Sequence, residues 1–386
     1  MSRTKDRPVS TGHIEARYHR LVVKMGTNLL TGGGDRLNLE VMANLVGQLA
    51  HLHSTGREAV MVSSGAIAAG RHRLALGKDH GRGMPLRQVF ASVGQSRLMN
   101  AWDQLFNWHD ITVAQTLLTR SDLSNRLGYL NARNTLMALL ELRVIPVINE
   151  NDVVAVEEIE GATFGDNDSL SALVANLVDA DLLVILSDID GLYTADPNQD
   201  PKAELISRVE RVDASIQRLA GASVSGRGTG GMITKVEAAK LATAFGVPVV
   251  IARGSEPDVL RRVAEGEILG TYFVPTATKM ESRRRWLISG LANQGTLAVD
   301  EGAAEALTAH NKSLLPAGIR EVRGKFPRGA TVEVVDGAGK WLACGIANYD
   351  SEDISRIKGH RSNEIEEILG YEYGDEVIHR NNLVMA

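Results

Sequence analysis

The chain has 386 residues, of which 44% are hydrophobic and 23% charged, and its formal net charge is −5. This length predicts two domains, since one domain usually has about 100–200 residues, and the composition is typical of soluble globular proteins. The small negative charge disfavours a protein that binds nucleic acid or anionic membranes through bulk charge. Cys344 is the only cysteine, so no disulfide can form within the chain, which favours a reducing compartment.

Residues 1–19 are polar, and we expect them to form a mobile tail. They lack the apolar core of a signal peptide. No run of about 18 apolar residues occurs anywhere, so no segment is predicted to span a membrane. These features together predict a cytoplasmic protein.

Residues 20–273 alternate short apolar runs with amphipathic helical stretches. Near-continuous apolar strands that alternate with helices predict a parallel sheet with helices on both faces, an αβα sandwich. Such sheets bind ligands at the carboxyl ends of their strands. The predicted strands are RLVVKM (20–25), EAVMVSS (58–64), ITVAQTLL (111–118), VIPVIN (144–149), LLVILSD (182–188) and VPVVIA (247–252), and the clearest helical stretches are 39–56, 169–180 and 235–246.

The pattern changes near residue 274. Residues 274–290 are polar and contain Pro and Thr, which is typical of a linker. Residues 291–386 predict a small β-rich second domain, because short strand-like runs alternate with Gly and Asp turn signals. The runs from the linker onward are RWLISG, GTLAVDEGA, TVEVVDG and WLACGIANY.

Two predicted strands end in residues suited to an anion. Lys24 closes the first strand, where a buried lysine is unfavourable unless it meets a negative charge, and Gly26 lets a ligand approach the backbone. A lysine that extends to solvent at the sheet edge is the alternative. Ser64 and Gly65 follow the second strand, before a helix whose N-terminus can receive a negative charge.

Acidic and amide residues gather after the fourth strand. Glu150 and Asp152 follow it directly, and residues 165–168 (GDND) open a later helix. One of Asn167 and Asp168 is expected to be the N-cap of that helix. Capping does not account for the density of acids, so we expect a polar pocket here.

The glycine-rich segment 225–235 (SGRGTGGMITK) places backbone N–H groups and Lys235, which we expect to be exposed on a loop, at the start of a helix. It is not a dinucleotide fingerprint, because no buried strand precedes it, and its spacing is not that of a Walker A loop. Two lysines near acids, without a nucleophilic Cys/His pair or a metal-ligand cluster, favour transfer of a phosphoryl group to a carboxylate. Two anions meet in that reaction, and fixed cations must offset their repulsion.

The chain resembles the amino-acid kinase family, and within it the enzymes that phosphorylate glutamate. Residues after 290 resemble the PUA domain through SLLPAGI, RGKFPRG, NYDSEDI and ILGYEYGDEVIHR. The kinase segments, in chain order, are LVVKMGTN, VSSGAIAAG, VGQSRLMNAW, LLTRSDLSNR, LNARNTL, VIPVINENDVVA, FGDNDSLSA, SDIDGLYTADP and VSGRGTGGMITK.

The resemblance implies an amino-acid kinase fold over 20–273 and a PUA-like domain over 291–386. It implies that ATP phosphorylates the side-chain carboxylate of L-glutamate to give L-glutamate 5-phosphate, the first step of proline biosynthesis, with Mg²⁺ held mainly through the nucleotide phosphates. L-proline is the implied inhibitor. A homo-oligomer and transfer of the labile product to glutamyl phosphate reductase are further expectations.

The resemblance also implies roles for single residues. Lys24 and Lys235 would neutralise the transferring phosphoryl group, and Asp168 would organise both lysines. L-glutamate would be held by Ser64, Asp152 and Asn167, with Asp152 on its α-ammonium. The nucleotide-binding site would be lined by Lys24, Ser187, Asp188, Thr229, Gly230, Gly231, Met232, Ile233, Thr234 and Lys235.

Two other functions stay open from the sequence. One is a relative that phosphorylates a different carboxylate, a carbamate or a nucleotide. The other is an RNA-binding protein, because PUA domains elsewhere bind RNA. Residues 281–386 contain 13 Lys and Arg against 16 Asp and Glu, a net charge of −3, whereas RNA-binding modules usually have a basic face. RNA binding is therefore not expected as the main function.

Overall fold

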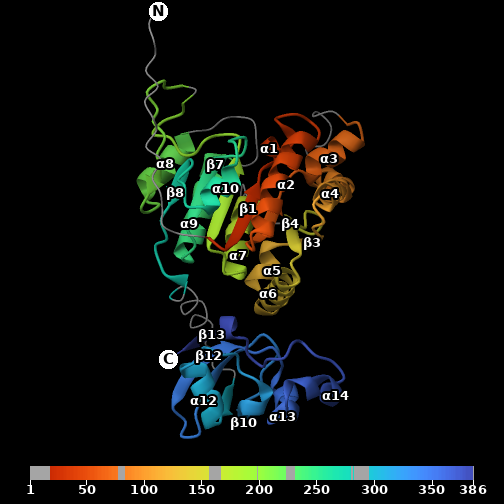
Figure 1. Cartoon of the computed structure of the whole chain (residues 1–386), viewed down its shortest axis with the longest axis vertical. Helices are drawn as coiled ribbons and strands as arrows, with labels where there is room; N and C mark the ends of the chain where they lie inside the picture. The colour runs from red at the N-terminus through yellow and green to blue at the C-terminus, as the bar shows by residue number, and fades with distance from the viewer. Residues whose placement is uncertain are drawn as a thin grey trace, which may run out of the picture. The chain divides into compact units, whose positions relative to one another are not determined.

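The computed structural model describes residues 18–76, 83–155, 167–197, 199–222, 231–279, 281 and 295–385. The chain divides into two compact units (Figure 1). Unit 1 consists of Met1–Arg120 and Thr135–Thr278, and unit 2 consists of Ser121–Asn134 and Lys279–Ala386. Within the described ranges, no helix combines the length and apolar character needed to cross a bilayer.

Unit 1 is built on an eight-stranded sheet with the order β3-β4-β2-β1-β5-β7-β8-β6. All neighbouring strands pair in parallel except β7 and β8, which are antiparallel. The predicted, mostly parallel sheet is thus confirmed, and all six predicted strands form. The strands are β1 (Arg20–Met25), β2 (Glu58–Ser63), β3 (Val113–Leu118), β4 (Ile145–Glu150), β5 (Leu182–Ser187), β6 (Arg208–Val209), β7 (Val249–Arg253) and β8 (Thr271–Phe273). The sequence did not predict β6 and β8, because two or three residues are too few to display a period-2 pattern.

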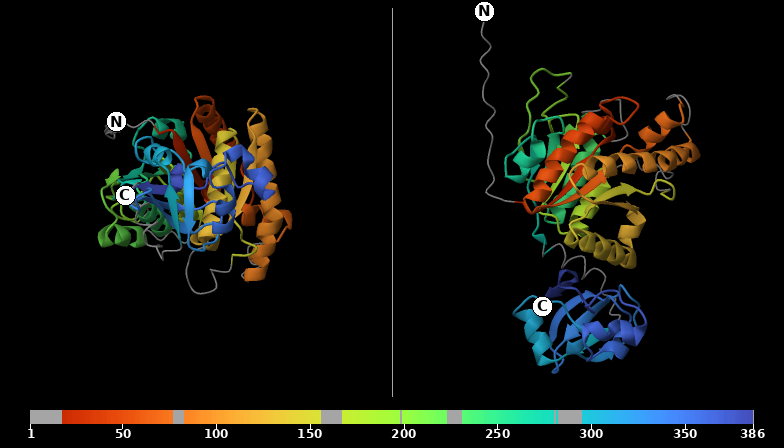
Figure 2. Two further views of the ribbon diagram at one scale, coloured as in Figure 1. Left: turned by 90° about the horizontal axis from the view of Figure 1, so that it is seen from below. Right: turned by 45° about the vertical axis from the view of Figure 1, so that its right-hand side comes forward.

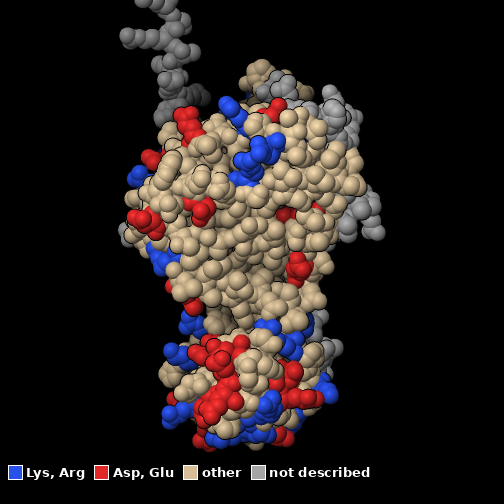
Figure 3. All heavy atoms as spheres, turned by 90° about the vertical axis from the view of Figure 1, so that its right-hand side faces the viewer, with Lys and Arg blue, Asp and Glu red and all other residues tan. Residues whose placement is uncertain are grey.

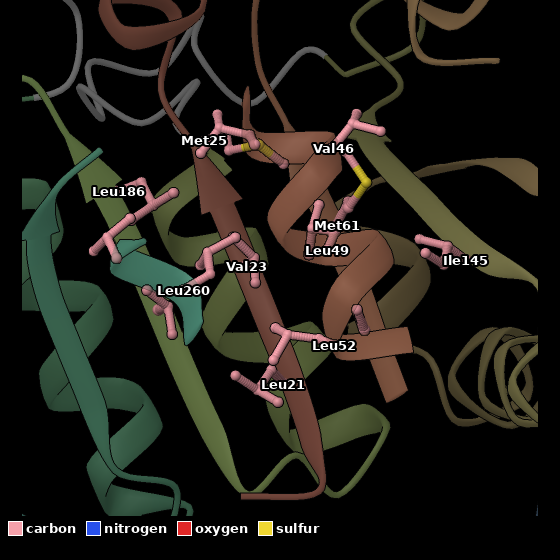
Figure 4. Packing of buried hydrophobic residues seen from close by; sticks show 14 of the residues in the cluster. Leu21, Val23, Met25, Val46, Leu49, Leu52, Met61, Ile145, Leu186 and Leu260 are labelled. Carbon is pink, nitrogen blue, oxygen red and sulfur yellow. The ribbon is translucent and has the colours of Figure 1, made fainter. Parts of the chain in front are cut away.

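Helices cover both faces of this sheet, as Figure 2 shows from two further directions. Side chains alternate along β1, so Leu21, Val23 and Met25 face one layer of helices while Lys24 faces the other. Figure 4 shows the first layer, where Leu49 of α2 and Leu260 of α10 pack toward β1. The helices in chain order are α1 (Thr27–Thr31), α2 (Leu39–Ser54), α3 (Ala66–Arg73), α4 (Met84–Asn107), α7 (Asn167–Leu177), α8 (Ala214–Ala222), α9 (Met232–Ala244) and α10 (Val259–Ala264).

The opposite face of the sheet is covered by α7 and α9. Helix α7 packs on β1, β2 and β5, and α9 packs on β7 and α7. The αβα sandwich is therefore confirmed. Its consequence for function is that the first turns of α7 and α9 lie on the same side of the sheet as Lys24.

Unit 2 contains a five-stranded sheet with the order β10-β9-β11-β12-β13. This agrees with the predicted β-rich C-terminal domain. Its elements are β9 (Thr296–Val299), α12 (Glu301–Thr308), β10 (Ile319–Arg323), β11 (Thr331–Val335), β12 (Trp341–Ile346), α13 (Ser351–Ile357), α14 (Ile365–Leu369) and β13 (Leu383–Met385). Cys344 is fully buried in β12.

One predicted strand in this unit is wrong in its second half. The run GTLAVDEGA forms a strand only over β9, and α12 begins at Glu301. The cause is local: the Asp300 side chain accepts a hydrogen bond from the Ala303 N–H, and the alanine-rich segment that follows favours a helix. The predicted run RWLISG lies outside the described residues.

Unit 2 also includes a segment from the middle of the chain, with α5 (Arg120–Ser124) and the first turns of α6 (Arg126–Glu141). Leu130 is fully buried there, in a cluster with Cys344, Ile346 and Val384. The Arg126 guanidinium donates to Thr331 Oγ1 at 2.6 Å. Sequence patterns gave no sign of this association, because helix α6 has an ordinary amphipathic pattern.

Candidate active site

The carboxyl ends of four adjacent parallel strands bring the predicted site residues to one edge of the sheet. Lys24 of β1 is in register with Val62 of β2 and with Ile185 of β5. Neighbouring strands lie about 4.8 Å apart, so the residues that follow β2 and β5 flank Lys24 on both sides. The first turns of α7 and α9 complete the arrangement above them.

A buried cluster of three charged side chains forms the centre of this edge. Asp168, in the first turn of α7, has no exposed surface, and it forms an ion pair with each of two lysines. Lys24 Nζ lies 2.5 Å from Asp168 Oδ1, and Lys235 Nζ lies 3.3 Å from Asp168 Oδ2. Thr234 Oγ1 also donates to Asp168 Oδ2, at 2.8 Å. Two ammonium groups and one carboxylate give this cluster a net charge of +1.

At this cluster one alternative is excluded and two expectations change. Lys24 is 2% exposed, so it does not extend to solvent at the sheet edge. Lys235 is not an exposed loop residue: it lies in α9 and is 6% exposed. Neither Asn167 nor Asp168 precedes the helix as an N-cap, because α7 already begins at Asn167 and the Asp168 carboxylate is engaged by the two lysines. A carboxylate that meets two ammonium groups gains more from them than from capping one backbone N–H.

A group of amides and hydroxyls lies beside the cluster. Asn167 Nδ2 donates to Ser64 Oγ at 3.0 Å and to Asn149 Oδ1 at 2.9 Å, so the predicted neighbours Asn167 and Ser64 do meet. Gly65 follows with φ +104°, a conformation that side chains disfavour, and serves as the N-cap of α3 without a side-chain hydrogen bond. The N-terminus of α3 therefore begins directly after Ser64 and Gly65. Asp152 lies half-buried in the turn that follows β4.

The other side of the cluster carries the residues predicted to contact a nucleotide. Ser187 Oγ donates to Asp188 Oδ1 at 3.1 Å, immediately after β5. Asn28 Nδ2 donates to Asp188 Oδ2 at 3.1 Å, a contact that the sequence did not predict. The feature of the sequence that could have indicated a role for Asn28 is that it is a polar residue only four positions after Lys24.

The glycine-rich segment is described only in part. Thr229 and Gly230 lie outside the described residues. Gly231 is the N-cap of α9, and among the described residues no atom beyond its chain neighbours lies within 4 Å of the position that a Cβ would take there. Met232 is buried, Ile233 is exposed, and Thr234 faces Asp168. The predicted helix start at this segment is confirmed.

A further ion pair, which the sequence did not predict, lies at the end of β7. Arg253 is in register with Ser187, and its guanidinium contacts both oxygens of Asp190, at 2.5 and 3.1 Å. Tyr193 Oη donates to Asp190 Oδ2 at 2.8 Å. The hydrogen bonds from Arg253 hold the pKa of Asp190 below its ordinary value. This pair anchors the segment that follows Ser187 and Asp188. The sequence contains no sign of it, because Arg253 directly follows an apolar run that predicts only a buried strand.

Two models of known protein families match this chain. The model of the amino acid kinase family matches residues 19–253, and the model of the PUA domain matches residues 295–369. Among solved structures, UMP kinase from Bacillus anthracis has a TM-score of 0.49 and 16% identity, covering 68% of this chain and 98% of that chain.

Curated relatives match over nearly the full length. The glutamate 5-kinase of Dehalococcoides mccartyi is 54% identical over 368 residues, covering 95% of this chain and 98% of that protein. The glutamate 5-kinase of Herpetosiphon aurantiacus is 54% identical over 367 residues, with the same coverage. That of Shewanella oneidensis is 50% identical over 374 residues, covering 96% of this chain and 99% of that protein. The chain belongs to the amino acid kinase family and carries a PUA domain after its kinase domain.

Proposed function

We propose that this protein is a glutamate 5-kinase, which transfers the γ-phosphoryl group of ATP to the side-chain carboxylate of L-glutamate. The product is L-glutamate 5-phosphate, and the reaction is the first step of proline biosynthesis. The observation that carries the proposal is the buried cluster of Lys24, Asp168 and Lys235, whose net charge of +1 suits an anion. The relatives named glutamate 5-kinase support the choice of acceptor.

The lysines meet the main electrostatic demand of this reaction. An acceptor carboxylate that approaches a phosphate at about 4 Å is repelled by about 4 kcal/mol per pair of unit charges at an effective dielectric constant near ~20. Lys24 and Lys235 neutralise the transferring group, and Asp168 holds both ammonium groups in place before the substrates arrive, so little reorganisation is needed at the transition state.

The bond changes need no general base. A side-chain oxygen of glutamate attacks the γ-phosphorus, the bond from that phosphorus to the bridging oxygen breaks, and the electron pair stays on ADP. The attacking carboxylate is already ionised, so no proton has to be removed, and the reaction depends on positioning and charge. The fully buried Asp168 therefore acts as the partner of the lysines and does not accept a proton.

Glutamate is assigned to the amide side of the cluster. Ser64, Asn167 and the first N–H groups of α3 offer hydrogen-bond donors to a carboxylate. Asp152, after β4, is assigned to the α-ammonium group. These assignments rest on the positions of Ser64 after β2, of Asp152 after β4 and of Asn167 in the first turn of α7.

The nucleotide is assigned to the other side. Ser187 and Asp188 line it after β5, and the segment from Thr229 to Lys235 lines it at the start of α9. In the part of the chain that the structure describes, no group of three His, Cys, Asp or Glu residues could hold a metal ion, and both oxygens of Asp168 already face lysines. These residues fit Mg²⁺ that is held mainly by the nucleotide phosphates, where it supplies further positive charge.

A phosphate-transfer assay tests the proposed function directly. The purified chain is incubated with ATP, Mg²⁺ and, in separate reactions, glutamate, N-acetylglutamate, aspartate or UMP. We expect ADP formation that depends on glutamate. Turnover with another acceptor, and none with glutamate, would assign the chain to a different reaction of the family.

The substitution Asp152→Asn should impair the use of glutamate far more than the binding of ATP. Asparagine has nearly the same shape but cannot balance the α-ammonium charge. Loss of one partner of such a contact costs about 2–5 kcal/mol, which is about 30-fold to several thousand-fold in kcat/KM for glutamate. The measurement combines kcat/KM for glutamate with a nucleotide titration of the same variant. Equal losses for both ligands would show that Asp152 supports the fold and does not contact the substrate.

We propose residues 20–273 as the catalytic domain, 274–290 as a linker and 291–386 as a PUA-like domain. Lys24, Asp168 and Lys235 all belong to unit 1. A chain that ends at Thr278 should therefore still phosphorylate glutamate. Because Leu130 is buried against residues of the deleted segment, the truncated chain should carry Leu130→Gln for solubility. A truncated chain that unfolds cooperatively but has no activity at any glutamate concentration would refute this assignment.

Further proposals concern partners and location. L-proline, the end product of the pathway, is the proposed inhibitor, and glutamyl phosphate reductase is the proposed recipient of the labile product. We place the protein in the cytoplasm.

Self-association is supported by the few charged side chains on the face of unit 1 seen in Figure 3 and by the exposed Trp108 and Leu142. RNA is not a proposed ligand, since residues 281–386 have a net charge of −3 and the face of unit 2 seen in Figure 3 carries acidic and basic side chains intermixed.

A further inference from the structure

We propose that Gln95 of α4 is a positioning residue for the acceptor site: it fixes the orientation of the amides that hold Ser64, and it thereby sets the affinity for glutamate. This inference rests on the proposed function. Gln95 belongs to the segment VGQSRLMNAW, which resembles the family but received no role from the sequence.

A chain of hydrogen bonds connects Gln95 to Ser64 through two asparagines. Asn149 Nδ2 donates to Gln95 Oε1 at 2.8 Å. Asn149 Oδ1 accepts from Asn167 Nδ2 at 2.9 Å, and Asn167 Nδ2 also donates to Ser64 Oγ at 3.0 Å. The chain thus runs from α4 across the end of β4 and the start of α7 to the end of β2.

The direction of this chain is set by a backbone group that can only donate. The N–H of Glu150 donates to Asn149 Oδ1 at 2.9 Å and to Asn167 Oδ1 at 3.3 Å. Because the Asn149 oxygen faces that N–H, the Asn149 NH₂ group must face Gln95. The Gln95 side chain must therefore present its oxygen as the acceptor. At the other end, Ser64 Oγ accepts from Asn167, which leaves the Ser64 hydroxyl proton to be donated elsewhere. A hydroxyl directed in this way suits a substrate carboxylate.

Helix α4 is held rigidly enough to act as the fixed end. A Cβ at Gly94, next to Gln95, would lie 1.7 Å from the Ala66 carbonyl oxygen, and one at Gly70 would lie 1.9 Å from that of Phe90. The backbones of α3 and α4 are therefore in direct contact. Gln88 lies seven residues before Gln95, on the same face of α4, and donates to the Val153 carbonyl at 3.0 Å. Helix α4 thus holds the β4 end on both sides of Asp152.

Stability does not explain why a glutamine stands at this position. Its Nε2 is buried and has no hydrogen-bond partner among the described residues, which is unfavourable for folding. Residues that reduce stability are typical of functional sites. The oxygen of Gln95, which holds the NH₂ group of Asn149 in place, is the part of the side chain that accounts for its presence.

The substitution Gln95→Met tests the proposal. Methionine has a similar length and helix propensity, so α4 should form and Tm should change by no more than about 2 °C. Without the acceptor, the Asn149 NH₂ group loses its hydrogen-bond partner and the side chain is held only at its oxygen. We therefore expect KM for glutamate to rise about tenfold while kcat and the Kd for ATP stay unchanged. Gln104→Met, at an exposed position of the same helix, is the matched control and should leave all three constants unchanged.

A double-mutant cycle with Asn149→Ala shows whether Gln95 acts through Asn149. We expect the double variant to have the same KM for glutamate as Asn149→Ala alone, because the connection from Gln95 to Ser64 has already been interrupted. An unchanged KM in Gln95→Met, equal losses for glutamate and ATP, or additive effects in the cycle would each overturn the proposal. If the wild-type chain phosphorylates glutamate, any of these outcomes refutes only the role of Gln95 and leaves the proposed function standing. A wild-type chain without glutamate-dependent turnover refutes the proposed function, and the role of Gln95 with it.

Discussion

Replacing Asp168 by asparagine should destabilise this protein strongly as well as inactivate it. The wild-type cluster contains two ammonium groups and one carboxylate, all buried, with a net charge of +1. The substitution removes the carboxylate and leaves a net charge of +2 in the cluster. Removal of one partner from a buried ion pair typically costs about 3–5 kcal/mol, because the remaining charge stays desolvated and uncompensated. We expect a loss of this size in the free energy of unfolding, measured by urea denaturation.

Anions should partly reverse the effect of this substitution. Sulfate or ATP binds beside the lysines of the folded state and supplies the missing negative charge, so either one should raise the Tm of Asp168→Asn more than that of the wild type. Asp103→Asn, at an exposed position of α4, is the matched control and should behave as the wild type. An Asp168→Asn protein with unchanged unfolding free energy and no added response to anions would contradict the electrostatic role assigned to Asp168.

Replacing Lys235 by methionine should lower the activity strongly and leave the stability nearly unchanged. The cluster becomes neutral, since Lys24 and Asp168 remain as a single pair, and methionine fills most of the volume of the lysine stem. Stability should therefore be maintained, whereas kcat should fall about 10²- to 10³-fold, the usual loss when one preorganised group that stabilises transition-state charge is removed. The measurement is kcat per folded molecule, together with Tm.

The control for this prediction lies on the same helix. Lys240 is exposed, and Lys240→Met should change neither quantity. The two substitutions at the cluster also predict an order: sulfate should stabilise Asp168→Asn most, the wild type less, and Lys235→Met least, because the cluster charges are +2, +1 and 0. Normal turnover in the folded fraction of Lys235→Met would remove Lys235 from the catalytic group.

The sequence by itself determined the class of the fold and grouped most of the candidate site residues. Strands of unit 1 that are buried on both faces must be almost wholly apolar, so a polar residue at the end of such a strand is visible in the sequence. Lys24, which follows the apolar residues LVV, and the Asn149–Asp152 segment, which follows VIPVI, are of this kind. The carboxyl ends of parallel strands meet at one sheet edge, and for this reason the sequence alone is enough to group these residues.

Only the tertiary structure decided how the grouped residues pair. Lys235 and Asp168 are 67 positions apart, and no local pattern indicates that a lysine after a glycine-rich segment becomes buried against an aspartate in another helix. The Arg253–Asp190 pair and the chain from Gln95 to Ser64 also join distant segments. Periodicity reports which face of an element is apolar, whereas a hydrogen bond depends on distances set by the packing of several elements at once. The polar contacts that orient the candidate site depend on this packing of several elements, and they therefore appear only in the folded chain.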